Sequence, residues 1–147
     1  MKKYILIALF LTNISILSAQ ETEKAAIKEV ILTSYVDGIH NRGGIEKVET
    51  GFHPGFEMLS INNGLLVRFP IYSWIESIKK AMASGQMQTE KVTAEIPLVD
   101  VAGDAAIARV ELYRAGKHLF TDYMNLYKFD DGWKIVAKTY YRIPEEK

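Results

Sequence analysis

The stretch HLFTDYMNLYKFDDGWKIVAKTYY, from His118 to Tyr141, decides the fold. Polar and apolar residues alternate on both sides of a single Asp-Asp-Gly turn, and this alternation predicts a two-stranded antiparallel hairpin. Asp122 is the exception, because it lies in the middle of the first strand among aromatic and aliphatic neighbours. Burying a carboxylate without a partner is costly. Asp122 therefore lies either in solvent or in an internal polar site.

The hairpin is the end of a longer series of strands. Two further segments of alternating residues, 89–101 and 105–114, precede it and are separated by glycine-containing turns. Upstream, the extended runs FEMLSI and LLVRF flank Asn62-Asn63-Gly64, and an Asn-Gly pair between two such runs strongly predicts a hairpin. The triplet His53-Pro54-Gly55 predicts a turn before them. We therefore expect about six strands in a mostly antiparallel sheet.

The N-terminal part of the chain predicts helices. Apolar or small residues recur at three- and four-residue steps from Ile27 to Gly38 and place Tyr35 on the buried face of a helix. Asn41–Gly44 ends this helix, and a short helix and then a longer one from Pro70 to Gly85 follow. Helices followed by a long strand series indicate an α+β fold. We expect a strongly curved sheet wrapped over the N-terminal helices as a cone with an internal pocket.

Residues 1–19 are typical of a secretory signal peptide. Two lysines near the start are followed by an apolar stretch, and Ser18-Ala19 supplies small residues for cleavage. Polar residues interrupt the stretch, so we expect cleavage near Ala19 and no stable membrane span, with an uncleaved anchor as the alternative. Residues 20–147 then form one domain that is exported to the periplasm or the exterior.

Composition excludes several classes of function. The chain has 18 basic and 18 acidic residues, and loss of Lys2 and Lys3 with the signal leaves 16 against 18. This balance argues against a nucleic-acid partner. The chain has no cysteine, so disulfides and thiolate sites are excluded. His40, His53 and His118 lack metal-ligand spacing, and no phosphate-binding or dinucleotide motif occurs, so we expect no metal and no cofactor.

The order of these elements resembles the nuclear transport factor 2-like superfamily, which includes ketosteroid isomerases and SnoaL-like polyketide cyclases. The segment FTDYMNLYKFDDGWKIVAKTYY is similar to the C-terminal signature of an exported bacterial family described as putative lumazine-binding. In that family a Phe-Thr-Asp-Tyr strand precedes a last strand led by tryptophan. The likeness covers the mature chain in element order and is specific in its last third. It implies the cone fold and an internal ligand site.

Comparison with the isomerases implies roles for two residues. Those enzymes use a tyrosine on the first helix and a protonated aspartic acid on a late strand as oxyanion donors, and Tyr35 and Asp122 occupy comparable positions. A proton-shuttling aspartate is expected within Phe56–Ile61, where this sequence has Ser60 and, three residues away, Glu57. A serine without a base cannot abstract a carbon-bound proton. The resemblance therefore implies two hydrogen-bond donors, but the base that abstracts the proton in the isomerases is not found at its expected position.

Alternation along the last two strands predicts which side chains face the interior. Lysines prefer solvent, so Lys134 and Lys138 are expected on the outer face of the last strand. The opposite, inward face of that strand carries Ile135, Ala137, Thr139 and Tyr141. On the preceding strand Asp122 is expected to point inward with its same-face neighbours His118, Phe120, Met124 and Leu126.

The outer face of the sheet predicts a protein partner. This face is expected to carry the tyrosines Tyr113, Tyr123, Tyr127 and Tyr140. An apolar patch of this kind is seldom left bare on a soluble monomer. We therefore expect a homodimer that forms through the outer sheet face.

Three functional hypotheses remain open, and the missing base favours the first. The first is an exported binding protein in which Tyr35 and Asp122 orient a small, flat, mostly apolar or aromatic molecule. Its other ligand contacts are expected to be Phe56, Met58, Trp74, Phe120 and Tyr141. The second is an isomerase, dehydratase or polyketide-cyclase-like enzyme that uses the same two donors and recruits His118 or Glu57 as base. The third is a dimeric interaction module whose cone is filled by its own side chains.

Overall fold

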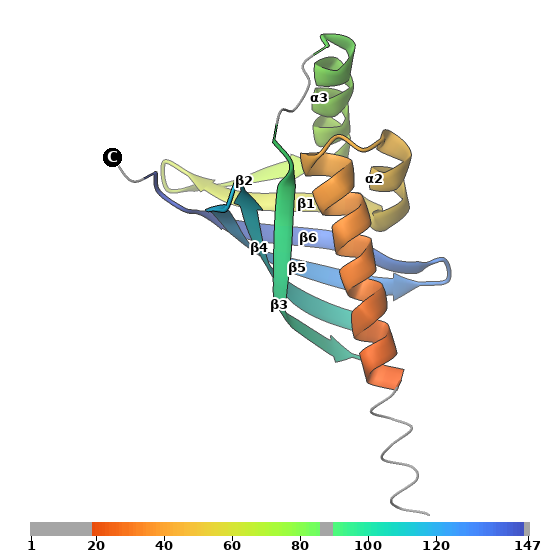
Figure 1. Cartoon of the computed structure of the whole chain (residues 1–147). Coiled ribbons are helices and arrows are strands. Elements are labelled where there is room, and N and C mark those ends of the chain that lie inside the picture. Colours follow the sequence, from red (N-terminus) through yellow and green to blue (C-terminus); the bar gives the residue numbers. More distant parts are fainter. Residues whose placement is uncertain (1–18, 86–89, 146–147) are drawn as a thin grey trace, which may run out of the picture.

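The computed structural model describes residues 19–85 and 90–145, which form one curved sheet with the helices packed across one of its faces (Figure 1). The six strands are ordered β2-β1-β6-β5-β4-β3, and the sheet does not close on itself. All neighbouring strands are antiparallel except β1 and β6, which are parallel. The predicted α+β cone is confirmed, with a mixed sheet. The predicted signal peptide lies, apart from Ala19, outside the described residues.

The strands follow the order expected from the sequence. Their bounds are β1 Phe52–Asn62, β2 Leu65–Pro70, β3 Val92–Ala102, β4 Ala105–Arg114, β5 Lys117–Phe129 and β6 Gly132–Arg142. Between β2 and β3 lies α3 (Ile71–Ala83), which begins directly after Pro70 as predicted. The last four strands form the long antiparallel meander that supplies most of the sheet.

The first helix changes its form along its length. Residues 19–30 are α-helical and continue directly into a π-helical segment, η1 (Ile31–His40). A π-helix of this length is uncommon, because the form usually occurs as a single-turn bulge. The predicted face is buried, with Ile27 and Tyr35 at 0% and 1% exposure. The short helix α2 (Ile45–Gly51) packs so closely against η1 that a Cβ atom on Gly51 would overlap the Ser34 side chain.

The hairpin predicted at Asn62-Asn63-Gly64 is confirmed. Asn63 and Gly64 both have positive φ angles, 49° and 77°, as a type I′ turn between two strands requires. The turn predicted at His53–Gly55 is wrong, because these residues lie within β1. There the pairing of β1 with β6 is interrupted, and the Gly55 N–H donates to His53 Nδ1 instead. The interruption accommodates Pro54, which has no N–H to give to a neighbouring strand.

A bulge in β6 reverses the inward face that simple alternation predicted. Asn125 pairs with Ala137 and Leu126 pairs with Ile135, so Val136 has no partner on β5. One extra residue moves every later side chain to the other face. Ile135 points inward as predicted, but beyond the bulge the inward residues are Lys138, Tyr140 and Arg142, because they pair with the inward residues of β5. The predicted outward Lys138 is therefore wrong, and so are the predicted inward Ala137, Thr139 and Tyr141.

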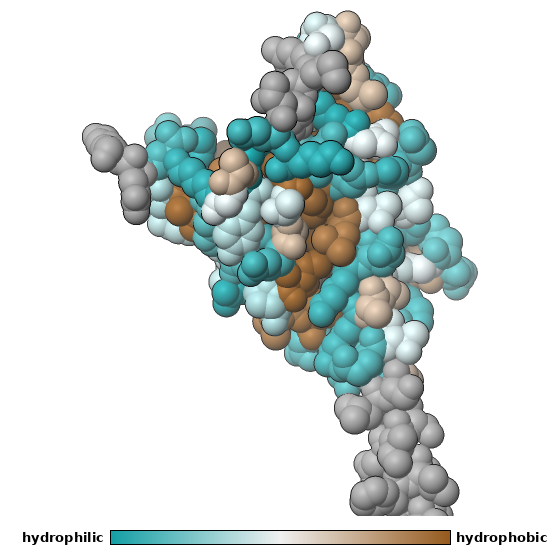
Figure 2. Space-filling view, in the orientation of Figure 1, coloured by the Kyte–Doolittle hydropathy of each residue, from teal (hydrophilic) through white to brown (hydrophobic). Residues whose placement is uncertain are grey.

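The core lies between the sheet and the helices. It combines residues of the first helix, such as Ile31, with the concave face of the meander, such as Val110 and Leu126, all at most 1% exposed. Figure 2 shows apolar surface in the seam between the first helix and β3, bordered by hydrophilic surface on both sides. Within residues 19–85 and 90–145, no helix has the length and apolar character needed to span a membrane.

Candidate functional site

A cavity of about 210 Å³ opens between the concave face of the sheet and the helices. Five elements that are distant in the sequence supply its wall. The lining residues are Tyr35, His40, Met58, Trp74, Phe120, Lys138, Tyr140 and Arg142. Aromatic rings dominate this set, and its only ionised side chains are cations. The wall therefore suits a flat molecule that presents electron-rich or negative atoms.

Three polar side chains form a closed, buried ring of hydrogen bonds at this wall. The Tyr35 hydroxyl donates to Asp122 Oδ2 at 2.5 Å, and the Lys138 ammonium donates to Asp122 Oδ1 at 2.7 Å. The same ammonium donates to the Tyr35 hydroxyl at 2.6 Å. The side chains of Tyr35, Asp122 and Lys138 are 1%, 0% and 4% exposed. Such a buried charge pair is tolerated because each group has its hydrogen-bond partners.

Burial and charge set the protonation of this ring. Burial lowers the pKa of the Lys138 ammonium, and the Asp122 carboxylate acts in the opposite direction. Burial and the adjacent Asp122 raise the pKa of Tyr35 well above its ordinary value, so Tyr35 remains a neutral phenol. Lys138 Nζ also lies 4.7 Å, 5.1 Å and 5.6 Å from the ring centroids of Tyr35, Tyr140 and Trp74. These aromatic faces attract the ammonium and fix it at the cavity wall.

His40 contributes a neutral ring to the cavity. Its imidazole packs edge-on against Tyr35, with 4.6 Å between ring centroids, and against Trp74 at 6.3 Å. Burial, followed by the positive charges of Lys138 and Arg114, lowers the pKa of His40 to about 3. Its Nε2 atom is buried and has no hydrogen-bond partner among the described residues. Local sequence signals did not indicate this role, because His40 lies just beyond the apolar helix face that ends at Gly38.

The structure brings most of the predicted ligand contacts to one place. Tyr35, Met58, Trp74 and Phe120 line the cavity. Phe56 lies beside them but is completely buried and stacks on Trp74 with 6.4 Å between centroids. Asp122 points inward, but both of its oxygens are used by Tyr35 and Lys138. Asp122 therefore positions the other two polar groups, and its carboxylate is an acceptor in this ring where the isomerase comparison implied a donor.

Two predicted residues lie outside this site. Tyr141 is 58% exposed and pairs with Thr121, which places it on the other face of the sheet from the cavity. His118 was expected to share the face of Asp122, but Leu119 is an extra residue in the pairing of β5 with β4. This second irregularity places His118 beside Thr121 on the outer face. Both errors have the same kind of cause. Each strand contains one extra residue, and the alternation of polar and apolar residues does not reveal it.

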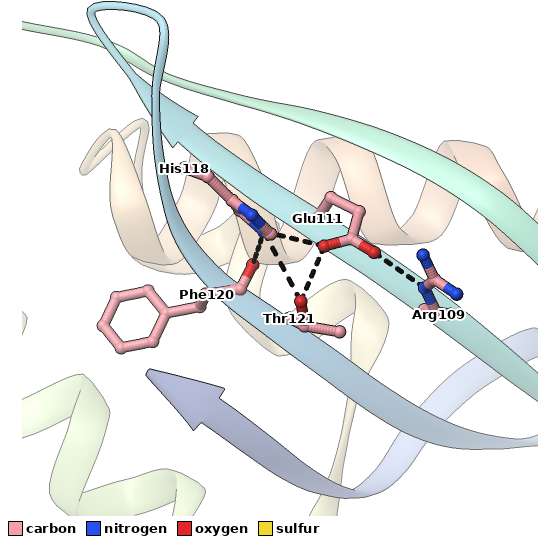
Figure 3. A network of polar contacts seen from close by, with 5 residues as sticks. All are labelled: Arg109, Glu111, His118, Phe120 and Thr121. Carbon is pink, nitrogen blue, oxygen red and sulfur yellow. Dashed lines mark hydrogen bonds and ion pairs between the residues drawn. The ribbon is translucent and has the colours of Figure 1, made fainter. Parts of the chain in front are cut away.

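His118 instead belongs to a polar network on the outer face, where it meets Glu111 (Figure 3). Glu111 is only 6% exposed and receives hydrogen bonds from Thr121 at 2.7 Å and from Arg109 at 2.6 Å. His118 Nε2 lies 2.7 Å from the same carboxylate. The bond from Thr121, and then the charge and bond of Arg109, lower the pKa of Glu111. This network ties β4 to β5, and it does not reach the Lys138 ring.

Neither of the bases proposed for an enzyme reaches the cavity. The Glu57 side chain is exposed on β1 and forms an ion pair with Arg68 at 3.2 Å. His118 lies on the outer face, as described above. Among the described residues, no carboxylate belongs to the cavity wall. The polar side chains at the wall are Tyr35, His40, Lys138, Tyr140 and Arg142, and sequence reasoning missed the last four.

Comparison with solved structures defines the class of this fold. An NTF2-like protein of unknown function from Silicibacter pomeroyi DSS-3 is 24% identical, with 84% of this chain and 98% of that chain covered and a TM-score of 0.68. A second NTF2-like protein of unknown function, from Shewanella baltica OS155, is 25% identical over 84% and 96% of the two chains, with a TM-score of 0.65. A cystatin-like domain from Nostoc punctiforme PCC 73102 is 16% identical over 84% and 79%, with a TM-score of 0.61.

The protein thus has an NTF2-like, cystatin-like cone fold. More particularly, the family model described as putative lumazine-binding matches residues 22–141, and the chain belongs to this family. The resemblance inferred from the strands around Asp122 is confirmed. No curated protein sequence matches the chain.

Proposed function

We propose that this protein binds a small, flat molecule in the cone, with an electronegative edge of the molecule held by Lys138. The observation that carries the proposal is the buried ammonium of Lys138 in the wall of an aromatic cavity. An ammonium has three N–H donors, and two of them are used by Asp122 and Tyr35. The third remains available for an acceptor on the ligand.

The aromatic wall accounts for the flat shape of the proposed ligand. Tyr35, Trp74, Tyr140 and Phe120 offer ring faces and edges around one small volume. Flat conjugated molecules gain from such contacts beyond simple burial of their area. The available volume also disfavours the alternative of a cone filled by its own side chains. We therefore place an aromatic or conjugated ring system in this cavity, with a carbonyl, phenolate or similar acceptor toward Lys138.

The residues of the cavity wall support a binding function better than the isomerase-like chemistry that the resemblance implied. That chemistry needs two hydrogen-bond donors and a carboxylate base that face the substrate. Here Tyr35 and Asp122 bond to each other, and no carboxylate of the described residues belongs to the cavity wall. A buried lysine can itself act as an acid or base. Turnover of any bound compound is therefore a direct test between the two functions.

The proposal is tested by a thermal-shift screen of the mature chain against phenols, pterins, flavins, steroids and short polyketides. A ligand held at about 100 times its dissociation constant adds about 2.7 kcal/mol of stability. A hit should be lost when Lys138→Met is combined with Asp122→Leu, which removes both buried charges together. It should persist in Lys134→Met, because Lys134 lies before the bulge and contacts Asp131 and the Thr50 carbonyl. A hit that is unaffected by the paired substitution would refute Lys138 as the ligand contact.

We also propose that the protein acts outside the cytoplasm. The proposal rests on the basic start, the interrupted apolar stretch and the Ser18-Ala19 pair in residues 1–19. The absence of cysteine is compatible with an oxidising compartment. In that location the cavity would meet small molecules from the surroundings of the cell.

A further inference from the structure

A second cavity, of about 300 Å³, lies where β4 ends, β5 begins and β6 ends. Phe120 and Arg142 line both cavities, so the two are neighbours that share part of one wall. The second cavity is bordered by the ends of β4, β5 and β6 and by the residues that follow β6. The two cavities therefore meet at Phe120 and Arg142.

The second cavity is rich in positive charge. Arg114, Lys117 and Arg142 line it, and Glu145 is the single carboxylate among its lining residues. Within the described part of the chain, none of the three cations forms an ion pair. The whole chain has a formal net charge of zero. This grouping is therefore a local feature and is not the consequence of a generally basic surface.

Arg114 provides a more specific sign of a ligand. Its Nε atom is buried and has no hydrogen-bond acceptor among the described residues. Buried donors without acceptors are rare in folded proteins, and each requires an explanation. After burial, the positive charges of Lys138 and Arg114 both lower the pKa of His40. The cations of the two cavities thus act on the same region of the cone.

We infer that the ligand is a flat ring system with an anionic group, a carboxylate or a phosphate, and that Arg142, Arg114 and Lys117 hold this group in the second cavity. The inference rests on the proposed function, because it places the ring of that same ligand in the aromatic cavity. Arginine suits such a role because its planar group donates two parallel bonds to a carboxylate or phosphate. Arg142 stands at the boundary and would contact the point where the ring meets its anionic substituent.

The test uses three probes that share the naphthalene ring and differ in its substituent: uncharged naphthol, naphthoate and naphthyl phosphate. Titration calorimetry on the mature protein at neutral pH should show that at least one anion binds about tenfold or more tightly than naphthol. The preference should shrink in Arg142→Gln and in Lys117→Gln. The preference should persist in Lys28→Gln. Lys28 is an exposed lysine on the first helix, so this substitution removes the same charge at a site away from the second cavity. Comparison of naphthoate with naphthyl phosphate decides which anionic group is preferred.

The outcomes separate this inference from the proposed function. Binding of naphthol with no preference for either anion would overturn the anion site and leave the aromatic cavity as proposed. An anion preference that falls equally in Lys28→Gln would also overturn it, because only the net charge would then matter. Failure of all three probes to bind would overturn both proposals. Higher salt should reduce the preference for the anions and leave naphthol binding nearly unchanged.

Discussion

The ammonium of Lys138 on β6 lies 2.7 Å from the buried carboxylate of Asp122 on β5, although the two residues are not register partners. Asp122 pairs with Tyr140, and Lys138 pairs with Met124. The ion pair therefore crosses the concave face of the sheet diagonally, within the reach of a long side chain. The hydroxyl of Tyr35, on the first helix, also donates a hydrogen bond to Asp122. This contact joins the meander to the helix layer at the wall of the cavity.

The first prediction concerns the stability of this pair. Lys138→Met leaves the Asp122 carboxylate buried without its cation, and it should lower the free energy of unfolding by about 3–5 kcal/mol. Lys138→Met combined with Asp122→Leu replaces both charges with apolar groups and should be much more stable than the single variant. Urea unfolding measures both changes. Lys134→Met serves as the control in the same strand, and additive losses in the combined variant would contradict a coupled pair.

The second prediction concerns acid stability and His40. The pKa of His40 is about 3 in the folded protein and 6.5 in its ordinary state, so the unfolded chain takes up the proton first as the pH falls. The stability present above pH 6.5 is therefore lost progressively toward pH 3, and the loss should reach about 2–3 kcal/mol near pH 4.5. His40→Phe keeps a ring between Tyr35 and Trp74 but cannot titrate. Unfolding measured at neutral pH and near pH 4.5 should show a smaller acid loss in His40→Phe, whereas His53→Gln should behave like the wild type.

The third prediction tests the bulge at Val136 through two adjacent tyrosines. Tyr140 lines the cavity, whereas Tyr141 is exposed on the opposite face. For any ligand found in the screen, Tyr140→Ser should lower affinity by about 1 kcal/mol or more, because a ring contact is lost. Tyr141→Ser should leave affinity unchanged. The reverse result would mean that β6 continues without the bulge.

The fourth prediction concerns the outer sheet face. Tyr123 and Tyr127 are about half exposed there, at 51% and 52%, and Ile107 is 47% exposed beside them. Tyr140 does not belong to this face, contrary to the sequence expectation, because it lines the cavity. We expect a homodimer through the outer face, which sedimentation equilibrium can measure. Tyr123→Ser with Tyr127→Ser should weaken the dimer, whereas Tyr72→Ser, a substitution at an exposed tyrosine on α3, should not.

The fifth prediction concerns export. When the full chain is expressed in a bacterium with an envelope, the mature form should begin near Gln20 and should be recovered outside the cytoplasm. Mass spectrometry of the purified protein locates the first residue. A chain that starts at Gln20 from its own initiator methionine is the control and should remain in the cytoplasm. An intact first segment on a membrane-bound product would favour the anchor alternative.

The sequence by itself determined the order of the elements, because this order depends on local signals. The Asn63-Gly64 turn needs two residues with positive φ, and the helix after Pro70 begins where a proline is best tolerated. Alternation within β5 also identified the inward face on which Asp122 lies. These signals act over a few residues, so they can be read without knowledge of the neighbouring strands.

The tertiary structure alone decided which side chains meet at the cavity. A single unpaired residue, Val136, turns Lys138 and Tyr140 inward and Tyr141 outward, and another, Leu119, separates His118 from Asp122. A bulge depends on how two strands pair, and it leaves no trace in the alternation of either strand alone. For the same reason, a lysine that the sequence assigns to solvent becomes the buried partner of Asp122. The partner of a buried charge is set by the sheet register, which forms only when the strands come together.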